Sequence, residues 1–282
     1  MNRLSSLLFL VLIPFLSFGQ DTIPAPVQKA NTSIWQDLGY DSMSMLQGAG
    51  HAFVAPGYWD KNDFITAGGL VVGTSILWIS DEPINDYFTN QSAGVPQGIK
   101  DGGYYFGKPL YNYALTGGIY CFGLFTRNEK IRKTGVLIVS SASAAAVVQT
   151  VLKNAVGRAR PYTGHGPATF HPFSKEEGFH SFPSGHAILS FTTAYAISKQ
   201  FKSPWVKGGL WALGLVTPVS RMWAGAHWAS DVGVGIMLSV ITVESVNKFL
   251  NANRYQDPVV SKKKISWNIN FTKQTIGLTG TF

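Results

Sequence analysis

Residues 140–148 read SSASAAAVV, and this run of small and apolar side chains decides the fold. The run lies within one of six apolar, nearly uncharged stretches, each long enough for a helix and none alternating with the two-residue period of a strand. Small side chains let helices approach one another closely. The sequence therefore predicts an all-α bundle of about six helices. The stretches are residues 64–80, 110–125, 134–152, 186–198, 205–219 and 232–247.

The composition indicates a helical protein at or near a membrane. Charged residues make up 13% of the 282 residues, aromatic residues 13%, and there are 30 glycines, a profile unlike that of a soluble cytosolic enzyme. The net charge is +8. However, the basic residues cluster in 127–133, 199–207 and 262–264, between apolar runs, and they are not interleaved with aromatic residues along any one segment. We therefore expect a membrane and no nucleic acid as partner.

The two ends of the chain differ from its apolar middle. Residues 1–20 have the basic, apolar and small-residue regions of a signal peptide; an uncleaved anchor helix is the alternative. Residues 21–59 are polar and predict an N-terminal arm with room for one short helix. Residues 60–250 form the predicted helical domain. In the tail, residues 251–282, apolar and polar side chains alternate from 265 to 271, which predicts a short C-terminal β-hairpin.

The first of three polar motifs is KNAVGRARP, residues 153–161. Lys153 and Arg160 are seven residues apart, so they share a face if the helix continues, although Pro161 disfavours helix at Arg160. A point cation and a planar guanidinium suit the oxygens of a phosphoryl group. The alternative is a pair of basic side chains at the end of a membrane helix.

The second motif is PSGH, residues 183–186, directly before an apolar run. Ser184 stands where a helix N-cap belongs, and the free amides of a helix N-terminus attract anions. Gly185 lets a ligand approach the backbone, and His186 is placed to give a proton to a leaving oxygen. An ordinary capped helix with an incidental histidine is the alternative.

The third motif is SRMWAGAHWASD, residues 220–231, with Arg221, His227 and Asp231. The four-residue spacing of His227 and Asp231 predicts that the carboxylate accepts the imidazole Nδ1–H and frees Nε2 to attack. Asp231 as a simple helix N-cap is the alternative. No second histidine or cysteine stands at metal-ligand spacing, so we expect no metal and no cofactor.

The order and spacing of these motifs resemble the type 2 phosphatidic acid phosphatase and vanadium haloperoxidase superfamily. That pattern is Lys, six residues, Arg-Pro; then Pro-Ser-Gly-His; then Ser-Arg, five residues, His, three residues, Asp. The matching residues are Lys153, Arg160, Pro161, Pro183, Ser184, Gly185, His186, Ser220, Arg221, His227 and Asp231.

The resemblance implies a hydrolase that needs no metal. His227 would attack phosphorus and form a phosphohistidine, Asp231 would orient it, and His186 would protonate the leaving oxygen and then activate water. The residues implied to hold the phosphoryl oxygens are Lys153, Arg160, Arg221, Ser184 and Gly185.

The resemblance also implies a lipid phosphate or diphosphate as substrate, at the bacterial envelope. A soluble periplasmic acid phosphatase, a vanadium-dependent haloperoxidase and an inactive scaffold are the alternatives. Placing the basic connections inside puts all three motifs on the periplasmic side of the membrane. Six spans with that orientation conflict with a cleaved signal peptide, so the number of crossings stays open. The sequence indicates no oligomeric state.

Overall fold

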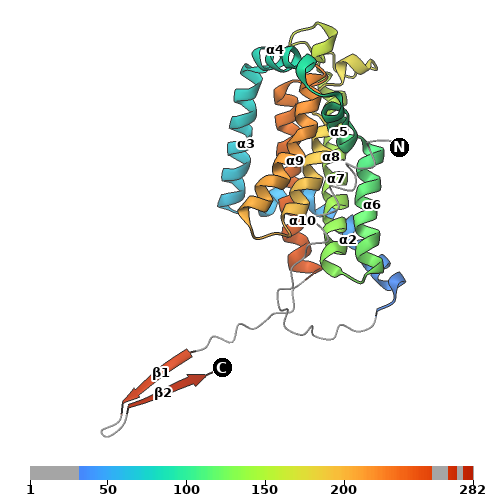
Figure 1. Ribbon diagram of the computed structural model, residues 1–282. Coiled ribbons are helices and arrows are strands. Elements are labelled where there is room, and N and C mark those ends of the chain that lie inside the picture. Colours follow the sequence, from blue (N-terminus) through green and yellow to red (C-terminus); the bar gives the residue numbers. More distant parts are fainter. Residues whose placement is uncertain (1–31, 256–265, 272–275, 282) are drawn as a thin grey trace. The chain divides into compact units, whose positions relative to one another are not determined.

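The computed structural model describes residues 32–255, 266–271 and 276–281. The predicted signal peptide lies outside these residues. Nine α-helices occur in the described part of the chain, with single-turn 3-10 helices between some of them (Figure 1). They are α2 (Ile34–Val54), α3 (Lys61–Ile79), α4 (Asp81–Gln91), α5 (Gln97–Gly107), α6 (Pro109–Phe125), α7 (Glu129–Val156), α8 (Gly185–Ser198), α9 (Pro204–Trp223) and α10 (Ala229–Asn253).

The predicted fold class is wrong in its number of helices. Each of the six apolar stretches lies largely within a helix, namely α3 and α6 to α10. The additional helices α2, α4 and α5 come from polar or glycine-rich sequence, which shows no continuous apolar run. Residues 32–255 contain no strand, so the fold that carries the motifs is all-α.

Helix α2 shows why polar sequence can form a long helix that a search for apolar runs does not predict. Its buried residues are Asp37, Asp41, Ser44 and Gly48, which recur at helical spacing but are not apolar. Both carboxylates form ion pairs with Arg132, near the start of α7. The distance is 2.6 Å for Asp37 and 2.7 Å for Asp41. A helix of 21 residues therefore replaces the short one expected in the arm, and it packs through polar contacts.

Helix α7 is the centre of the bundle. It contacts α2, α6, α8 and α10 (Figure 1). Ser140 and Ser141 are at most 1% exposed. A Cβ atom added to Gly48 of α2 would lie 3.1 Å from Ser140 Oγ. The close helix contacts expected from SSASAAAVV are confirmed.

Helix α3 presents apolar side chains on the outside of the bundle. None of its residues is buried, and Phe64, Ile76 and Ile79 are 59%, 60% and 82% exposed. Among the described helices, α3, α7 and α10 are long and apolar enough to cross a membrane. Large exposed apolar surface of this kind suits contact with lipid.

In the tail, β1 (Ser266–Phe271) and β2 (Ile276–Thr281) pair as antiparallel strands. Ser266 is opposite Thr281, and Phe271 is opposite Ile276. These strands form a two-stranded sheet by themselves.

The bundle brings the three motifs to one end. Helices α7 and α9 end there, and α8 and α10 begin there (Figure 1). The loop of residues 157–184 and helix α4 lie at the same end (Figure 1). A small apolar cluster of Ala187, Met222, Ala229 and Val232 joins the starts of α8 and α10 to the last turn of α9. The motif residues therefore stand on a packed base.

Candidate active site

The first motif leaves helix α7 before it reaches Arg160. Lys153 lies in the last turn of α7, which ends at Val156, and Gly157 follows with a φ of 59°. A Cβ atom at Gly157 would lie 1.8 Å from the carbonyl oxygen of His171, so only glycine fits this turn. Lys153 and Arg160 therefore do not share a continuous helix face.

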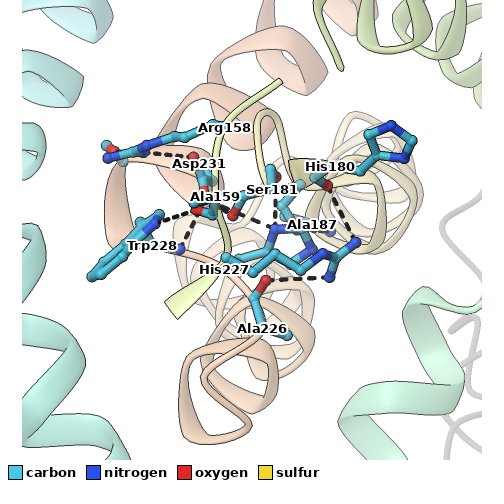
Figure 2. Close-up of polar contacts among 12 residues, drawn as sticks. Arg158, Ala159, His180, Ser181, Ala187, Ala226, His227, Trp228 and Asp231 are labelled. Carbon is cyan, nitrogen blue, oxygen red and sulfur yellow. Dashed lines mark hydrogen bonds and ion pairs between the residues drawn. The ribbon is translucent and has the colours of Figure 1, made fainter. Parts of the chain in front are cut away.

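Arg160 is held by backbone carbonyl groups. Its guanidinium donates to the carbonyl oxygen of Glu177 at 3.0 Å. It also donates to the carbonyl oxygens of Ala226 and His180, both at 3.2 Å (Figure 2). A guanidinium has five N–H groups, so these bonds fix its position and leave donors for an anion.

The second motif forms the start of α8 as expected. Ser184 is the N-cap residue, and its side chain accepts a hydrogen bond from the Ala187 amide at 3.4 Å. Its own amide donates to the carbonyl oxygen of Asp231 at 3.1 Å, which ties the second motif to the third. Gly185 leaves space in front of Gln149, whose Nε2 would lie 3.1 Å from an added Cβ atom.

His227 has a fixed tautomer. It is 2% exposed, and its Nδ1 lies 2.8 Å from the carbonyl oxygen of Ser181 (Figure 2). A carbonyl oxygen only accepts hydrogen bonds, so neutral His227 carries its proton on Nδ1 and keeps a lone pair on Nε2. This is the state that a nucleophilic imidazole requires.

The carboxylate of Asp231 does not make the contact that its spacing predicts. Its Oδ2 lies 3.9 Å from His227 Nδ1, beyond hydrogen-bond distance. Oδ2 accepts instead from the Ser181 hydroxyl and from the Trp228 amide at 2.9 Å, as in a capping box. Asp231 is therefore linked to His227 only through Ser181, whose hydroxyl donates to Asp231 and whose backbone oxygen accepts a hydrogen bond from the imidazole.

Arg158, which is not one of the motif residues, is a fully enclosed charge of the site. It is 0% exposed. Its guanidinium forms ion pairs with Asp81 at 2.7 Å and Asp231 at 2.6 Å, donates to Ser230 Oγ at 2.8 Å, and lies 4.1 Å from the ring centre of Trp78. Its place between Lys153 and Arg160 is visible in the sequence, but its two partners stand 77 and 73 residues away.

Helix α5 and its C-cap residue contribute two further groups that the sequence motifs do not include. The Tyr104 ring stacks on His186 at 5.3 Å between centres, and the guanidinium carbon of Arg221 lies 5.2 Å from the same ring. Lys108 Nζ lies 5.5 Å from the Tyr104 ring. No residue pattern in 97–108 marks these roles, because they arise only when α5 packs against α8 and α9.

Both histidines are neutral at pH 7 in this setting. Burial, reinforced by the positive charges of Arg160, Lys153 and Arg221, holds the pKa of His227 well below its ordinary value. Burial and the charge of Arg221, followed by the other nearby cations, lower the pKa of His186 to about 4. For both rings burial is the first cause, and the neighbouring cations lower the pKa further.

The three cations predicted to bind phosphate have no carboxylate partner among the described residues, in contrast to Arg158. Two polar atoms in the site, His186 Nε2 and Arg221 Nε, are buried and have no hydrogen-bond partner in the described part of the chain. Buried, uncompensated groups of this kind are expensive unless a ligand satisfies them. The arrangement suits an anion. The described residues contain no group of three or more His, Cys, Asp or Glu side chains that could hold a metal ion.

A sequence profile of the PAP2 superfamily matches residues 134–255, the part that contains all three motifs. The resemblance to the PAP2 superfamily that the motifs indicate is confirmed over these residues. It is 33% identical over 107 residues to a lipid A 1-phosphatase of Rhizobium etli, covering 36% of this chain and 44% of that protein. It is 31% identical over 115 residues to an undecaprenyl-diphosphatase of Sulfolobus acidocaldarius, covering 39% and 52%. The chain thus spans about half the length of these PAP2 relatives or less.

A solved structure has a similar fold. It is that of a transmembrane PAP2 type phosphatidylglycerolphosphate phosphatase from Bacillus subtilis, with a TM-score of 0.50 at 21% identity over 68% of this chain and 99% of that one. The likeness concerns the fold. The three long apolar helices support association of this protein with a membrane.

Proposed function

We propose that this protein is a membrane phosphatase that hydrolyses a lipid phosphate or diphosphate through a phosphohistidine, without a metal ion. The observation that carries the proposal is the state of His227. It is buried, its Nδ1 faces a carbonyl oxygen at 2.8 Å, and positive charges surround it. A neutral imidazole in a cationic pocket is suited to attack an anionic phosphorus centre, because the cations neutralise the phosphoryl oxygens.

The chemistry proceeds in two displacements. His227 Nε2 attacks phosphorus while the bond to the leaving oxygen breaks, and His186 gives that oxygen a proton. Water then attacks the phosphohistidine, the P–N bond breaks, and His186 takes the proton from water. Throughout both steps, Nδ1–H of His227 remains bonded to the Ser181 carbonyl group.

The proton on His186 must come with the substrate. With a pKa of about 4, the imidazole is neutral at pH 7 in the free protein. A bound phosphate brings negative charge beside the ring, which raises the pKa of His186. A monoanionic phosphate can then hand its proton to His186 before the leaving group departs.

Lys153, Arg160 and Arg221, with the Ser184 hydroxyl and the Gly185 amide, would hold the phosphoryl oxygens. The three cations supply the charge neutralisation that Mg²⁺ provides in other phosphoryl-transfer enzymes. Because the side chains neutralise the phosphoryl charge, we expect turnover without a metal ion.

A lipid substrate is supported by two observations. The bundle beside the motifs exposes apolar helix surface, most of all on α3. The names of the relatives, lipid A 1-phosphatase and undecaprenyl-diphosphatase, refer to phosphate groups on lipids. We further propose that the site faces the periplasm, because the basic connections 126–133 and 199–207 join the helices at the end opposite to the motifs (Figure 1).

The test is phosphate release from lipid phosphates and soluble phosphomonoesters, in detergent and in excess chelator. We expect hydrolysis of lipid phosphates that persists with chelator and disappears in His227→Ala. The exposed His165 provides the matched control, His165→Ala, which should keep full activity. Normal hydrolysis by His227→Ala would refute the nucleophile, and loss in chelator that Mg²⁺ restores would refute the metal-free mechanism. Preference for soluble esters without detergent would favour a soluble acid phosphatase.

A further inference from the structure

Helix α3 indicates where a bilayer ends on this protein. It has 19 residues and a length of about 28 Å, close to the hydrocarbon core of about 30 Å. Charged groups mark its start, where Asp60 caps the helix and Asp63 binds Lys248 at 2.6 Å. Trp78 stands at its other end, on the motif side of the bundle (Figure 1). Because tryptophan is enriched where hydrocarbon meets water, this boundary falls at Trp78.

The loop of residues 157–184 places an aromatic ring at the same end of α3. The Phe170 ring stacks on the Trp78 ring, with 5.8 Å between the ring centres and 5° between the planes. Both rings remain exposed, as does Ile79, the last residue of α3. This stacked pair therefore extends the exposed apolar surface of α3 onto the loop.

The same loop places a second aromatic residue at the end of α7, another helix long and apolar enough to cross a membrane. Val147 and Val151 share one face of α7 and are 54% and 61% exposed. The Phe173 amide donates to the carbonyl oxygen of Asn154, in the last turn of α7, at 2.7 Å. Phe173 is 75% exposed and has a φ of 58°, which is unfavourable for a bulky side chain. The loop thus exposes an aromatic residue at the motif end of each of two candidate spans.

The segment that carries both phenylalanines, residues 169–173, is bonded directly to the first motif. The Ala159 amide donates to the Thr169 carbonyl oxygen at 3.0 Å, and the His171 amide donates to the Gly157 carbonyl oxygen at 2.7 Å. The position of the exposed rings is therefore tied to that of the motif whose cations are proposed to bind phosphate.

We propose that Trp78, Phe170 and Phe173 form a membrane-contact surface that inserts into the interfacial layer of the bilayer and holds the first motif at the level of the lipid head groups. Continuity with α3, which has no buried residue, favours lipid over a protein as the partner. The assignment rests on the proposed function as a membrane phosphatase and deepens it, because a lipid phosphate then reaches the site without leaving the bilayer.

The first experiment measures the contact directly, on the full chain in phosphatidylcholine vesicles. Cys121, the single cysteine, is removed as Cys121→Ser, and Phe173→Cys in that background is labelled with bimane. His165→Cys is the matched control, since His165 is also exposed on the same loop. We expect blue-shifted emission at position 173, quenched by lipids with brominated acyl chains, and emission typical of water at position 165.

Two results of this experiment would contradict the surface. Unquenched, water-like emission at position 173 would overturn it and leave Phe173 available to a protein partner or a second copy of the chain. Equal quenching at positions 173 and 165 would show a loop that lies on the membrane without the selective aromatic contact proposed.

The second experiment measures what the contact does for hydrolysis. Phe170→Ser, Phe173→Ser and the control His165→Ser are each given two phosphatidates with the same head group, dioleoyl in the vesicle and dibutanoyl in solution. Loss of folded protein lowers both rates equally, so their ratio isolates the effect of the bilayer. The ratio of kcat/KM, vesicle over solution, should fall about threefold to tenfold in the two phenylalanine variants, because a phenyl ring no longer leaves water, and should stay at the wild-type value in His165→Ser.

The two experiments separate the surface from the phosphatase. An unchanged ratio in both phenylalanine variants would overturn the role of the surface in presenting the substrate. No hydrolysis of either phosphatidate by wild type, with bimane at position 173 still quenched, would count against the phosphatase and leave the membrane contact standing.

Discussion

Asp231→Asn separates two roles that the carboxylate of Asp231 could have. If Asp231 fixed the tautomer of His227 directly, as in a catalytic triad, its amide would lower kcat about 10⁴-fold. In this structure the imidazole Nδ1–H donates a hydrogen bond to the Ser181 carbonyl oxygen at 2.8 Å, and the nearest carboxylate oxygen of Asp231 lies 3.9 Å from Nδ1. We therefore expect a loss of only about 10- to 100-fold, from weaker electrostatic support of the cationic phosphohistidine.

We expect Asp231→Asn to lower the stability of the fold and to leave the tautomer of His227 unchanged. Asp231 accepts from Arg158, the Ser181 hydroxyl and the Trp228 amide, and one amide oxygen cannot replace two carboxylate oxygens. Breaking a buried ion pair costs about 3–5 kcal/mol. The lower end applies, because Arg158 keeps its bond to Asp81 at 2.7 Å. At about 2–4 °C per kcal/mol for a chain of this size, the melting temperature should fall by about 10 °C.

The assay combines three measurements on the protein in one detergent. Thermal unfolding gives the stability loss, phosphate release well below the variant's melting temperature gives kcat, and ¹⁵N NMR of labelled histidine gives the tautomer of His227. Ser181→Ala is the control, since it removes the hydroxyl that bonds to Asp231 and keeps the backbone carbonyl group. A 10⁴-fold loss in a stable Asp231→Asn protein, with the proton moved from Nδ1 to Nε2, would refute the indirect role.

Three further substitutions test other parts of the site. Arg158→Met leaves two buried carboxylates unpaired and should lower the unfolding free energy by about 3–5 kcal/mol, measured by denaturant unfolding; an unchanged midpoint would contradict the buried pairing. Lys108→Met removes a positive charge near His186 and should raise its pKa from about 4 in an NMR titration. Because the folded pKa of this histidine is depressed, wild type should lose stability as pH falls from about 6.5 toward 4. Gly157→Ala should cost far more stability than Gly164→Ala: both have positive φ, an added strain of about 1–2 kcal/mol, but only Gly157 meets a carbonyl oxygen, at 1.8 Å. Equal melting temperatures would contradict this.

The sequence predicts the apolar helices well, because burial of apolar surface follows a helical period that can be read along the chain. It fails for α2, whose buried face consists of Asp37, Asp41, Ser44 and Gly48. From sequence alone, an aspartate is predicted to lie at the surface unless its partner in an ion pair is known. Here Arg132 supplies the ion pairs and Tyr120 donates a hydrogen bond to Asp41 at 3.0 Å. Partners about 80 to 95 residues apart cannot be matched from one sequence.

In the candidate site, too, local features are predicted correctly from the sequence and long-range contacts are not. The motifs place Ser184 correctly at its N-cap, because capping is a local property. The partner of His227 was misassigned, since a four-residue spacing admits a helical contact only if both residues are helical. His227 precedes α10, which begins at Ala229, and its ring contacts the backbone oxygen of Ser181 instead. A contact with a backbone atom does not depend on the type of residue, so the sequence does not indicate it.

Two arginines in one motif show how charge is divided in the site. Arg158 is enclosed and paired with two carboxylates, so its charge is cancelled and it serves as a structural tie. Among the described residues, Arg160 donates only to neutral carbonyl groups, so its charge remains to act on the phosphate site and adds to the effect of burial in depressing the pKa of His227. A protein that merely required rigidity would gain nothing from leaving this second charge uncompensated near a buried imidazole. The free-energy cost of this uncompensated charge is offset when an anion binds. Arg160, more than Arg158, therefore argues for a site that binds a phosphoryl group.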